Sequence, residues 1–588
     1  MCGIVGYVGD KKALIKIMTG LKSLEYRGYD SSGIAYVKDG IVKILKEEGP
    51  IRNLEEKINY NEITTIGISH TRWSTHGAAN KINAHPHRQG KITLVHNGII
   101  ENYEQLKREL LNQGYCFQSN TDTEVAAAVI DSLYKKSQDM VLVLNEAVKM
   151  LTGSYAFNII NDDYPDTIFA MRKDSPLIVG IGQKENILAS DIPAILHITN
   201  KYVVLDNYDI VVMQSNKLEY YNADNQKISK QINIFVGDIE TISKNGYDHY
   251  MLKEINEEPE IVKRILTLYT DEGRIKIPFK LSKYASVDIV ACGSASFAGQ
   301  LGKFYIEKFL NIPTSVTFAS EYRYQKNFFR KDKLVILISQ SGETADTLAA
   351  LKLAKDNGVT TLAIVNRKDS SIAREADNVI YTEAGIEVSV ATTKAYLAQV
   401  IVLLLLAASG SKEEGSVLND LKILPNIITK QINDYDYKKV SEFLYKKENI
   451  FYLGRGIDYF LAMEGSLKLK EISYIHSEAF AAGELKHGSI SLIDENFGVI
   501  AVVTDKNISH KTISNLKEVA ARSAKILTIT NINDDSFSDY VIKIDDISDV
   551  LNPLLAIIPM QLLAYNIAKL KNCDIDKPRN LAKSVTVE

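Results

Sequence analysis

The second half of the chain contains the same pattern twice, and this duplication restricts the folds open to it. The segment VDIVACGSASFAGQLGKFYIEKF is similar to ENIFYLGRGIDYFLAMEGSLKL, which aligns Gly293 with Gly454 at an offset of 161 residues. A second pair, beginning LVILISQSGET and GVIAVVTDKNI, aligns Asn366 with Asn531 at an offset of 165. Each copy alternates strand, glycine- or serine-containing turn and helix, which is typical of parallel βαβ units. We therefore expect two doubly wound α/β domains with parallel sheets.

The first half has a different rhythm. Short β-rich runs such as TIGISHTRW, KITLVHNG and YAFNII alternate irregularly with helical patterns such as TDTEVAAAVIDSLYKK, which indicates an α+β domain. The stretch between the two halves is polar and then helical, and is typical of a connector. The expected divisions are the α+β domain over 2–238, the connector over 239–280, the two copies over 281–425 and 440–575, and a C-terminal tail over 576–588.

Composition and charge exclude several classes of function. A formal net charge of −4 over 588 residues implies neither a nucleic-acid footprint nor a basic face for membranes. The four cysteines are widely spread, which argues against a zinc site and a disulfide framework. No signal peptide is recognisable, and the apolar stretches LAQVIVLLLLAAS and LNPLLAIIPMQLLAYNIA are too short or too interrupted to span a bilayer. We expect a cytoplasmic protein in which both stretches are buried helices.

Hydroxyl-rich turns stand where a doubly wound sheet binds its ligands, at the carboxyl ends of the strands. SQSGET follows the strand LVILI and leads directly into the helix ADTLAALKLAK. Such turns could merely cap helices, because Ser and Thr are preferred there. Three of them in one sheet favour a phosphorylated ligand, since helix N-termini attract anions. They contain Ser294 and Ser296; Ser339, Gln340, Ser341, Gly342 and Thr344; and Thr392, Thr393 and Lys394.

These motifs carry a family resemblance. The duplicated SQSGET unit resembles the sugar-isomerase (SIS) domain, which binds phosphosugars. CGIVGY, LEYRGYDSSG, SHTRWSTHG, NAHPH, HNGIIEN and TDTE together resemble a class II glutamine amidotransferase domain. With EGSLKLKEISYIHSEAFAAGELKHG and PRNLAKSVTVE, the order of motifs is similar to that of the glutamine–fructose-6-phosphate aminotransferase family over essentially the whole chain.

The resemblance implies a fold and an activity. The fold is an αββα sandwich of the N-terminal nucleophile (Ntn) hydrolase type, followed by two doubly wound SIS domains. The activity is glutamine-dependent amination and isomerisation of fructose 6-phosphate to glucosamine 6-phosphate, the first step of amino-sugar synthesis. Ammonia passes between two sites through an internal channel. The implied partners are the two small-molecule substrates and a second copy of the chain in a homodimer, with no metal and no organic cofactor.

Cys2 lies directly behind the initiator methionine. The run CGIVGYVG could be an ordinary first strand with a small apolar residue in it. The resemblance implies instead that Met1 is removed and that Cys2 becomes the first residue. Its α-amine, with an ordinary pKa of about 7.7 to 8.0, is then suited to act as general base for its own thiol. The thiolate would attack glutamine and form a glutamyl thioester.

The other amidase residues are assigned by the same resemblance. Asn97 and Gly98 would form the oxyanion hole, although Asn-Gly is also a favoured hairpin turn. Asp122 could instead be only a helix-start acid in the capping box from Thr121 to Glu124. Trp73, the only tryptophan, would gate the ammonia passage rather than simply fill a core. The residues assigned to glutamine binding are Arg72, Trp73, Thr75, His76 and Asp122.

The acceptor half must open the ring of fructose 6-phosphate and move a proton between C1 and C2. Lys468 and Glu471 share a helix face with Glu464, a spacing that by itself favours a solvated salt-bridge face. The resemblance assigns proton transfer to Glu471, ring opening to His487 donated across the dimer interface, and a Schiff base to Lys583. The residues assigned to sugar-phosphate binding are Ser294, Ser339, Gln340, Ser341, Thr344, Val390, Ala391, Lys468 and Ala582.

Two other interpretations stay open. An amidophosphoribosyltransferase shares the amidase half but needs an acidic loop for phosphoribosyl pyrophosphate, which the second half lacks. A phosphosugar-sensing regulator with a vestigial amidase is the second. Ser294-Ala295 stands where the family usually has Thr-Ser, so one hydroxyl of the sugar-phosphate site is missing. The regulator is opposed by the joint presence of Cys2, Arg72, Asn97, Asp122, Glu471 and Lys583.

Overall fold

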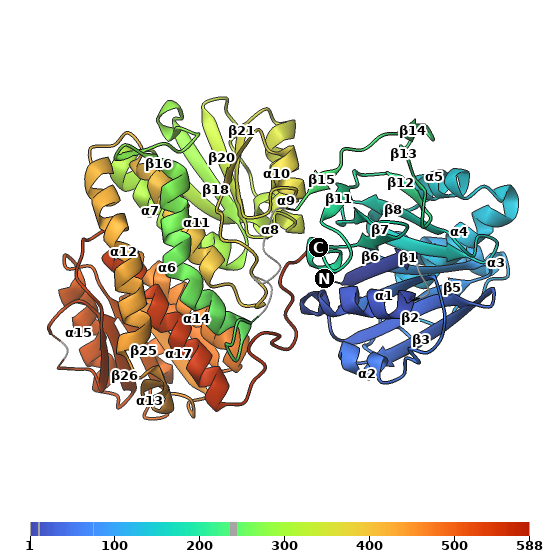
Figure 1. Cartoon of the computed structure of the whole chain (residues 1–588). Helices are drawn as coiled ribbons and strands as arrows, with labels where there is room; N and C mark the ends of the chain where they lie inside the picture. The colour runs from blue at the N-terminus through green and yellow to red at the C-terminus, as the bar shows by residue number, and fades with distance from the viewer. Residues whose placement is uncertain (1, 10–11, 74–75, 236–243, 535, 587–588) are drawn as a thin grey trace. The chain divides into compact units, whose positions relative to one another are not determined.

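The structure is a computed structural model, and its elements are labelled in Figure 1. The chain divides into two compact units, which are described separately. The first comprises Met1–Ser243 with Ser584–Glu588, and the second comprises Lys244–Lys583. The structure describes residues 2–9, 12–73, 76–235, 244–534 and 536–586.

Two antiparallel sheets form the first unit, and neighbouring strands in each are hydrogen-bonded. One sheet has the order β15 (Asn233–Ile234), β11 (Lys201–Val204), β9 (Ile178–Ile181), β10 (Asn186–Ala189), β1 (Gly3–Val8), β4 (Ile66–Arg72), β2 (Ser31–Lys38), β3 (Ile41–Glu48). The other has the order β14 (Lys227–Ile228), β13 (Leu218–Tyr221), β12 (Ile210–Met213), β8 (Ile168–Lys173), β7 (Gly153–Asn161), β6 (Ile92–Ile100), β5 (His87–Gln89).

Side-chain alternation makes this unit a four-layer sandwich. Ile4 of β1 packs between the sheets with Val95 of β6, whereas its neighbour Val5 faces the other way, against Ile17. Successive residues of a strand point to opposite faces, so each sheet can bury both. The outer faces are covered by α1 (Ala13–Lys22) and α2 (Ile51–Glu55) on the first sheet, and by α3 (Tyr103–Asn112), α4 (Asp122–Ser137) and α5 (Met140–Met150) on the second. The predicted αββα sandwich is confirmed.

The second unit contains two parallel sheets with the same topology. In each, the strand order is second, first, third, fourth, fifth along the chain, which is the flavodoxin-like order of doubly wound folds. The first copy runs β19 (Thr314–Phe318), β18 (Ser286–Ala291), β20 (Lys333–Ser339), β21 (Thr360–Val365), β22 (Asn378–Tyr381). The second runs β24 (His476–Ala481), β23 (Asn449–Gly454), β25 (Gly498–Val503), β26 (Lys525–Thr530), β27 (Tyr540–Lys543). The duplication predicted from the sequence is thus a duplication of the fold.

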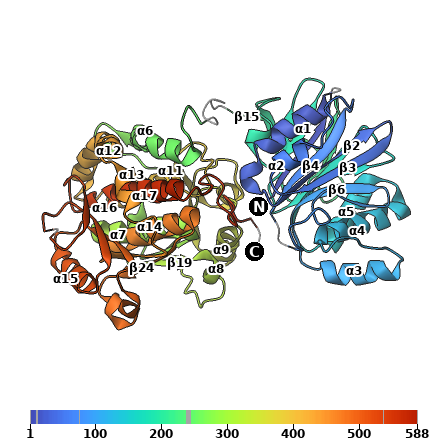
Figure 2. The ribbon, with the colours of Figure 1, turned by 90° about the horizontal axis from the view of Figure 1, so that it is seen from below.

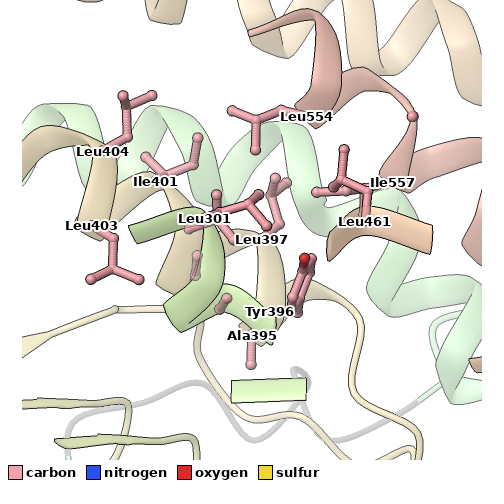
Figure 3. Packing of buried hydrophobic residues seen from close by; sticks show 14 of the residues in the cluster. Leu301, Ala395, Tyr396, Leu397, Ile401, Leu403, Leu404, Leu461, Leu554 and Ile557 are labelled. Carbon is pink, nitrogen blue, oxygen red and sulfur yellow. The ribbon is translucent and has the colours of Figure 1, made fainter. Parts of the chain in front are cut away.

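Helices of the two copies share one hydrophobic core. Leu301 of α7 and Leu397 of α11 pack in the same cluster as Leu461 of α14 and Leu554 of α16 (Figure 3). Every residue of α11 is buried, as the sequence predicted for this apolar stretch. The helices of this unit include α7 (Gly293–Leu310), α8 (Ala319–Tyr322), α9 (Ala345–Asp356), α10 (Ser371–Glu375), α11 (Lys394–Ala408), α12 (Glu414–Asp434), α13 (Tyr437–Glu442), α14 (Ile457–Ser473), α15 (Ser509–Ala520), α16 (Asn552–Leu555) and α17 (Ile557–Leu570).

Residues 239–280, predicted from the sequence to be a connector, contribute a long helix to the second unit. This helix, α6 (Tyr250–Tyr269), buries Met251 and Ile255 in the shared core. It contacts α11, α12 and α17, and Figure 2 shows it beside α12 and α11. Glu254 of this helix accepts from the Val388 N–H at 2.6 Å, so the helix reaches the loop that precedes α11 in the first copy.

One segment of the described chain, Asn552–Leu570, is long and apolar enough to cross a membrane, with a mean hydropathy of 1.4. It consists of α16 and α17, and 83% of it is buried within the fold. The segment is therefore part of the hydrophobic core, as the sequence predicted for this stretch. Its apolar composition is accounted for by packing.

Candidate functional site

Cys2 lies where β1 begins, next to the end of β4. The backbone N–H of Trp73 donates to Sγ of Cys2 at 3.2 Å, and this sulfur lies 3.4 Å from the Trp73 carbonyl oxygen. The contact follows from pairing of the strands, since Gly3 is opposite Thr71. Burial raises the pKa of the Cys2 thiol, while the nearby Arg72 guanidinium acts to lower it. The thiol therefore needs a base to become a nucleophile.

Asn97 and Gly98 lie inside β6 rather than at a hairpin turn, so the hairpin alternative is wrong. Nδ2 of Asn97 donates to the Cys2 carbonyl oxygen at 2.9 Å, which fixes the amide beside the cysteine. Gly98 has a φ of +133° and is opposite Tyr155 in β7. A Cβ on Gly98 would lie 2.0 Å from the Ser154 carbonyl oxygen, so only glycine fits. The structure places Asn97 beside Cys2, and Gly98 follows it in the same strand.

Arg72 shapes the loop that follows β4. Its guanidinium donates to the carbonyl oxygens of His76, Gly77 and Ala78, the last two at 3.3 Å. His76 packs edge-on against Tyr103, with ring centroids 5.2 Å apart. Thr75 lies outside the described residues. Arg72 and His76 thus belong to one loop at the end of β4.

Trp73 follows Arg72 and is half-buried. Its ring packs edge-on against Tyr29, with centroids 6.2 Å apart. The main-chain N–H of the same residue is the donor to Cys2 Sγ. Trp73 therefore links the cysteine to the loop of Arg72.

Asp122 is the first residue of α4, and its carboxylate is directed back to β6. Oδ2 accepts from the Ile100 N–H at 2.8 Å and lies 3.9 Å from Nδ1 of His96. Thr121 caps the helix, because its hydroxyl accepts from the Glu124 N–H at 3.3 Å. Asp122 is an acid of the first turn, as the helix-start alternative expected, and its carboxylate makes the additional contact with β6.

The hydroxyl-rich turn of the first copy lies between β20 and α9. Ser339 Oγ accepts from the Gly342 N–H at 3.0 Å and is 3.0 Å from the Thr344 hydroxyl, while Ser341 Oγ accepts from the Glu343 N–H at 3.1 Å. Gly342 has a φ of +65°, and its Cβ would lie 2.0 Å from Ser370 Oγ. The turn is compact and directs its groups to the N-terminus of α9, a position suited to an anion.

The tail places Lys583 against the loop that precedes α11. Nζ of Lys583 forms an ion pair with Glu387 and lies 3.1 Å from Thr392 Oγ1, and both charged side chains are at most 5% exposed. The Val390 N–H donates to the Asp576 carbonyl oxygen at 3.0 Å, which joins the same loop to the beginning of the tail. Ala391 of this loop is buried, and Ala582 of the tail is half-buried. The buried ion pair of Lys583 and Glu387 therefore joins the tail to the loop.

The charged face of α14 is buried, so the solvated salt-bridge interpretation is wrong. Lys468 Nζ lies 2.6 Å from Glu471 and 3.5 Å from Glu464. Ser294 of the first copy donates to Glu464 Oε1 at 3.1 Å, and burial raises the pKa of Glu464 to about 7. Glu464 was not among the predicted site residues, although its spacing from Lys468 already placed it on the same face. Through the contact between Ser294 and Glu464, this face of α14 connects the second copy to the first.

His487 lies apart from these clusters in the contacts of its own chain. It ends the short helical turn Glu484–His487 and is exposed to solvent. Among the described residues it has no hydrogen bond or ion pair. The structure therefore brings Lys468 and Glu471 together and Lys583 with its loop, but leaves His487 outside both groups.

Family models match both units. The model described as "Glutamine amidotransferase domain" matches residues 70–197, and the one described as "SIS domain" matches residues 280–409 and 443–570. The SIS matches coincide with the two parallel sheets.

Similar full-length proteins carry one name. "Glutamine--fructose-6-phosphate aminotransferase [isomerizing]" of Clostridium tetani is 45% identical, and that of Caldanaerobacter subterraneus subsp. tengcongensis is 46% identical, in both cases over 100% of each chain. Among solved structures, the C-terminal domain of glucosamine-fructose-6-phosphate aminotransferase from Francisella tularensis is 39% identical, with a TM-score of 0.55 over 57% of this chain and 99% of that one. The chain belongs to the glutamine–fructose-6-phosphate aminotransferase (isomerizing) family.

Proposed function

We propose that this chain transfers the amide nitrogen of glutamine to fructose 6-phosphate and isomerises the product to glucosamine 6-phosphate, releasing glutamate. The observation that carries the proposal is the buried Lys583 of the second unit, in a chain whose first unit places Asn97 beside Cys2. A lysine amine is the group that forms an imine with a ketose, and a cysteine beside an amide donor suits acyl transfer. The full-length similarity to aminotransferases supports the combination.

The glutaminase step uses Cys2 as nucleophile. Once Met1 is removed, the α-amine of Cys2 takes the thiol proton, which overcomes the raised pKa of the buried thiol. The thiolate attacks the amide carbon, and the oxyanion is held by the Asn97 side chain and the Gly98 N–H. The proton returns to the leaving ammonia, and water hydrolyses the thioester to glutamate.

Glutamine is held by the loop after β4 and by the start of α4. Arg72 binds the α-carboxylate and Asp122 the α-amine, with Thr75 and His76 on the same loop as Arg72. Burial of the Asp122 carboxylate beside Ile100 supports this role, because a fixed carboxylate is suited to an ammonium group. Trp73 controls the passage of ammonia to the second site.

The second unit binds and rearranges the sugar phosphate. The turn after β20 holds the phosphate through its hydroxyls and the N-terminus of α9, with Ser294 and the main chain of Val390, Ala391 and Ala582 around the sugar. Lys583 forms an imine with C2 of the open-chain ketose, and water leaves. After ammonia has replaced the lysine, Glu471 moves the proton from C1 to C2, with Lys468 beside it. The phosphate ligands are Ser339, Gln340, Ser341 and Thr344.

His487 opens the sugar ring in the partner's site. Its exposure, with no hydrogen bond to the described residues of its own chain, supports donation across a homodimer interface. Mixing a His487→Ala variant with a Lys583→Arg variant tests this directly. Donation across the interface leaves one heterodimer site with both residues intact, so activity returns on mixing. If each chain supplied its own histidine, the mixture would stay inactive.

The activity is tested by the identity of the product. Glutamine labelled with ¹⁵N in its amide is supplied with fructose 6-phosphate or with phosphoribosyl pyrophosphate, and the aminated product is identified by mass. We expect ¹⁵N in glucosamine 6-phosphate only. Label in phosphoribosylamine would support the amidophosphoribosyltransferase alternative, and sugar binding without label transfer would support the regulator. Cys2→Ala is the control and should abolish glutamine hydrolysis while phosphosugar binding survives.

A further inference from the structure

A second layer of buried carboxylates lies behind the loop that holds Lys583. In the loop, Glu387 Oε1 accepts from the N–H groups of Thr393 at 3.0 Å and Ala395 at 3.1 Å. Its other oxygen pairs with Lys583 and accepts from the Thr392 hydroxyl. Glu387 therefore has two tasks, since it closes the start of α11 and also receives the lysine of the tail. Any shift of its backbone would move both groups.

The backbone directly after Glu387 is fixed from α6. Oε1 of Glu254 accepts from the Val388 N–H at 2.6 Å and from the Ser389 N–H at 3.3 Å. Glu254 is 2% exposed, and its buried Oε2 has no hydrogen-bond partner among the residues that the structure describes. Burying such a carboxyl is costly, so its retention at this position calls for a reason other than stability.

The same helix also holds the far end of the loop. Glu257, one turn along α6, pairs with Lys394 at 2.6 Å. The loop from Glu387 to Lys394 is thus attached to α6 at both ends, next to Glu387 by Glu254 and at the start of α11 by Glu257. A loop attached at two points has little freedom to displace Glu387.

We propose that Glu254 is a positioning residue for Lys583, which acts by fixing the main chain of residues 387–389 so that Glu387 meets the lysine amine. The inference rests on the proposed function, because it concerns imine formation between Lys583 and the ketose. It assigns to α6, a helix outside both sheets, a direct share in the geometry of the sugar site.

The protonation state of Glu254 indicates which substitution preserves this role. Burial raises the pKa of Glu254 to about 8, and the neighbouring Glu387 acts in the same direction, whereas Lys583 and Lys394 oppose it. On the same helix, burial raises the pKa of Glu258 to about 8 as well. Burial therefore favours the neutral acid of Glu254. A glutamine resembles the neutral acid and keeps an acceptor oxygen for Val388.

The test compares three variants of the full-length protein. Glu254→Met fills a similar volume without an acceptor, a change that buried acids often tolerate in stability. Glu254→Gln restores an acceptor, and Glu260→Met is the matched control, because Glu260 lies on the same helix with its side chain 66% exposed. The main readout is the rate at which borohydride traps the adduct of Lys583 with fructose 6-phosphate. Glutamine hydrolysis and the KM for fructose 6-phosphate are measured alongside it.

We expect Glu254→Met to slow trapping and kcat of synthesis by about 10-fold or more, the effect of misplacing a reacting group by a fraction of an ångström. Glutamine hydrolysis and KM should change little, Glu254→Gln should restore most of the rate at pH 7, and Glu260→Met should match the native protein. Native trapping in Glu254→Met would overturn the inference. Equal loss in the Met and Gln variants would also do so, since an acceptor would then not matter. If the native protein forms no adduct, the proposed function fails instead.

Discussion

The two copies in the second unit have the same strand order, but different groups lie at the turn that follows the third strand of each, β20 in the first copy and β25 in the second. In the first copy, Ser339, Gly342 and Thr344 leave hydroxyls and a helix N-terminus turned to the end of the sheet. In the second copy, the carboxylate of Asp458 from α14 binds the main chain of this turn. It accepts from the Thr504 N–H at 2.7 Å and from the Asp505 N–H at 3.3 Å. The internal offset places Asp458 where the first copy has Phe297.

The loops before the last helix differ in the same way. In the first copy, Glu387 is left to pair with Lys583 of the tail. In the second, Asn552 precedes α17, and its side chain accepts from the Ile547 N–H at 2.7 Å and donates to Asp546 at 2.8 Å. The second copy therefore closes its turn with the carboxylate of Asp458, while the first copy has hydroxyls in its turn and a glutamate that pairs with the lysine of the tail. The comparison teaches that the sheet is a scaffold and that a few side chains decide whether its carboxyl end binds anything.

Lys583→Arg should produce the largest effect, because it removes the amine that forms the imine beside Glu387 of the first copy. Arginine keeps the positive charge for Glu387 but cannot form an imine. We expect synthesis to fall by at least about 10³-fold, with no borohydride adduct and with glutamine hydrolysis retained. Product formation and peptide mass spectrometry measure these outcomes. A variant that makes glucosamine 6-phosphate at the native rate would show that Lys583 is only an electrostatic contact.

Gly342→Ala should have an intermediate effect, because Gly342 combines a φ of +65° with a Cβ position 2.0 Å from Ser370 Oγ. The strained turn would displace its hydroxyls, and we expect the KM for fructose 6-phosphate to rise about 10- to 100-fold, which corresponds to about 1–3 kcal/mol.

The matched control for this prediction is Gly456→Ala in the second copy. Gly456 has a similar φ of +58°, but the nearest atom to its Cβ is a side-chain methyl of Ile508 at 3.2 Å. This variant should lose stability without a change in KM. An equal rise of KM in both variants would contradict the assignment of sugar binding to the first copy.

Asp458→Asn should have the smallest effect on catalysis, because Asp458 lies in the second copy, and its signature is the pH dependence of stability. Burial raises the pKa of Asp458 to about 7, against about 3.9 in an unfolded chain. The folded state therefore binds the extra proton between these values, so stability falls as pH rises from about 4 to 7 and is level above. The Asn variant lacks this contribution, and its stability relative to the native protein should improve by up to about 1.4 kcal/mol per pH unit in that window. Unfolding midpoints from pH 4 to 8 measure the difference, and parallel profiles would refute it.

Local patterns in the sequence predicted much of the fold. The offset between Gly293 and Gly454 predicted the two parallel sheets, because each copy contains its own strands, turns and helices. The burial of α6 within the second unit could not be predicted from such local patterns. Its polar carboxylates are typical of an exposed helix, and only the packing against distant loops buries Glu254 and Glu258.

The sequence predicted which residues belong to the site better than it predicted how they are arranged. Family motifs pointed to Asn97 and Gly98, but their position within β6 depends on pairing with β7, a partner more than fifty residues away. The same holds for Glu464, whose contact with Ser294 joins helices from the two copies. Contacts between segments far apart along the chain leave no periodic signal in either one.

Burial of α11 on all sides also bears on how this protein could be divided or could have evolved. A gene fragment that ended after the first copy would leave Leu397 and Ile401 without the second copy's Leu461 and Leu554, which share their cluster. Each such residue returned to water costs about 2 kcal/mol, and the fragment would expose an adhesive apolar surface. The two copies resemble each other in sequence and fold, but each now needs the other to bury its helices, so both must be encoded and synthesised together. Attempts to isolate either one should yield aggregates unless α11 is redesigned with a polar face.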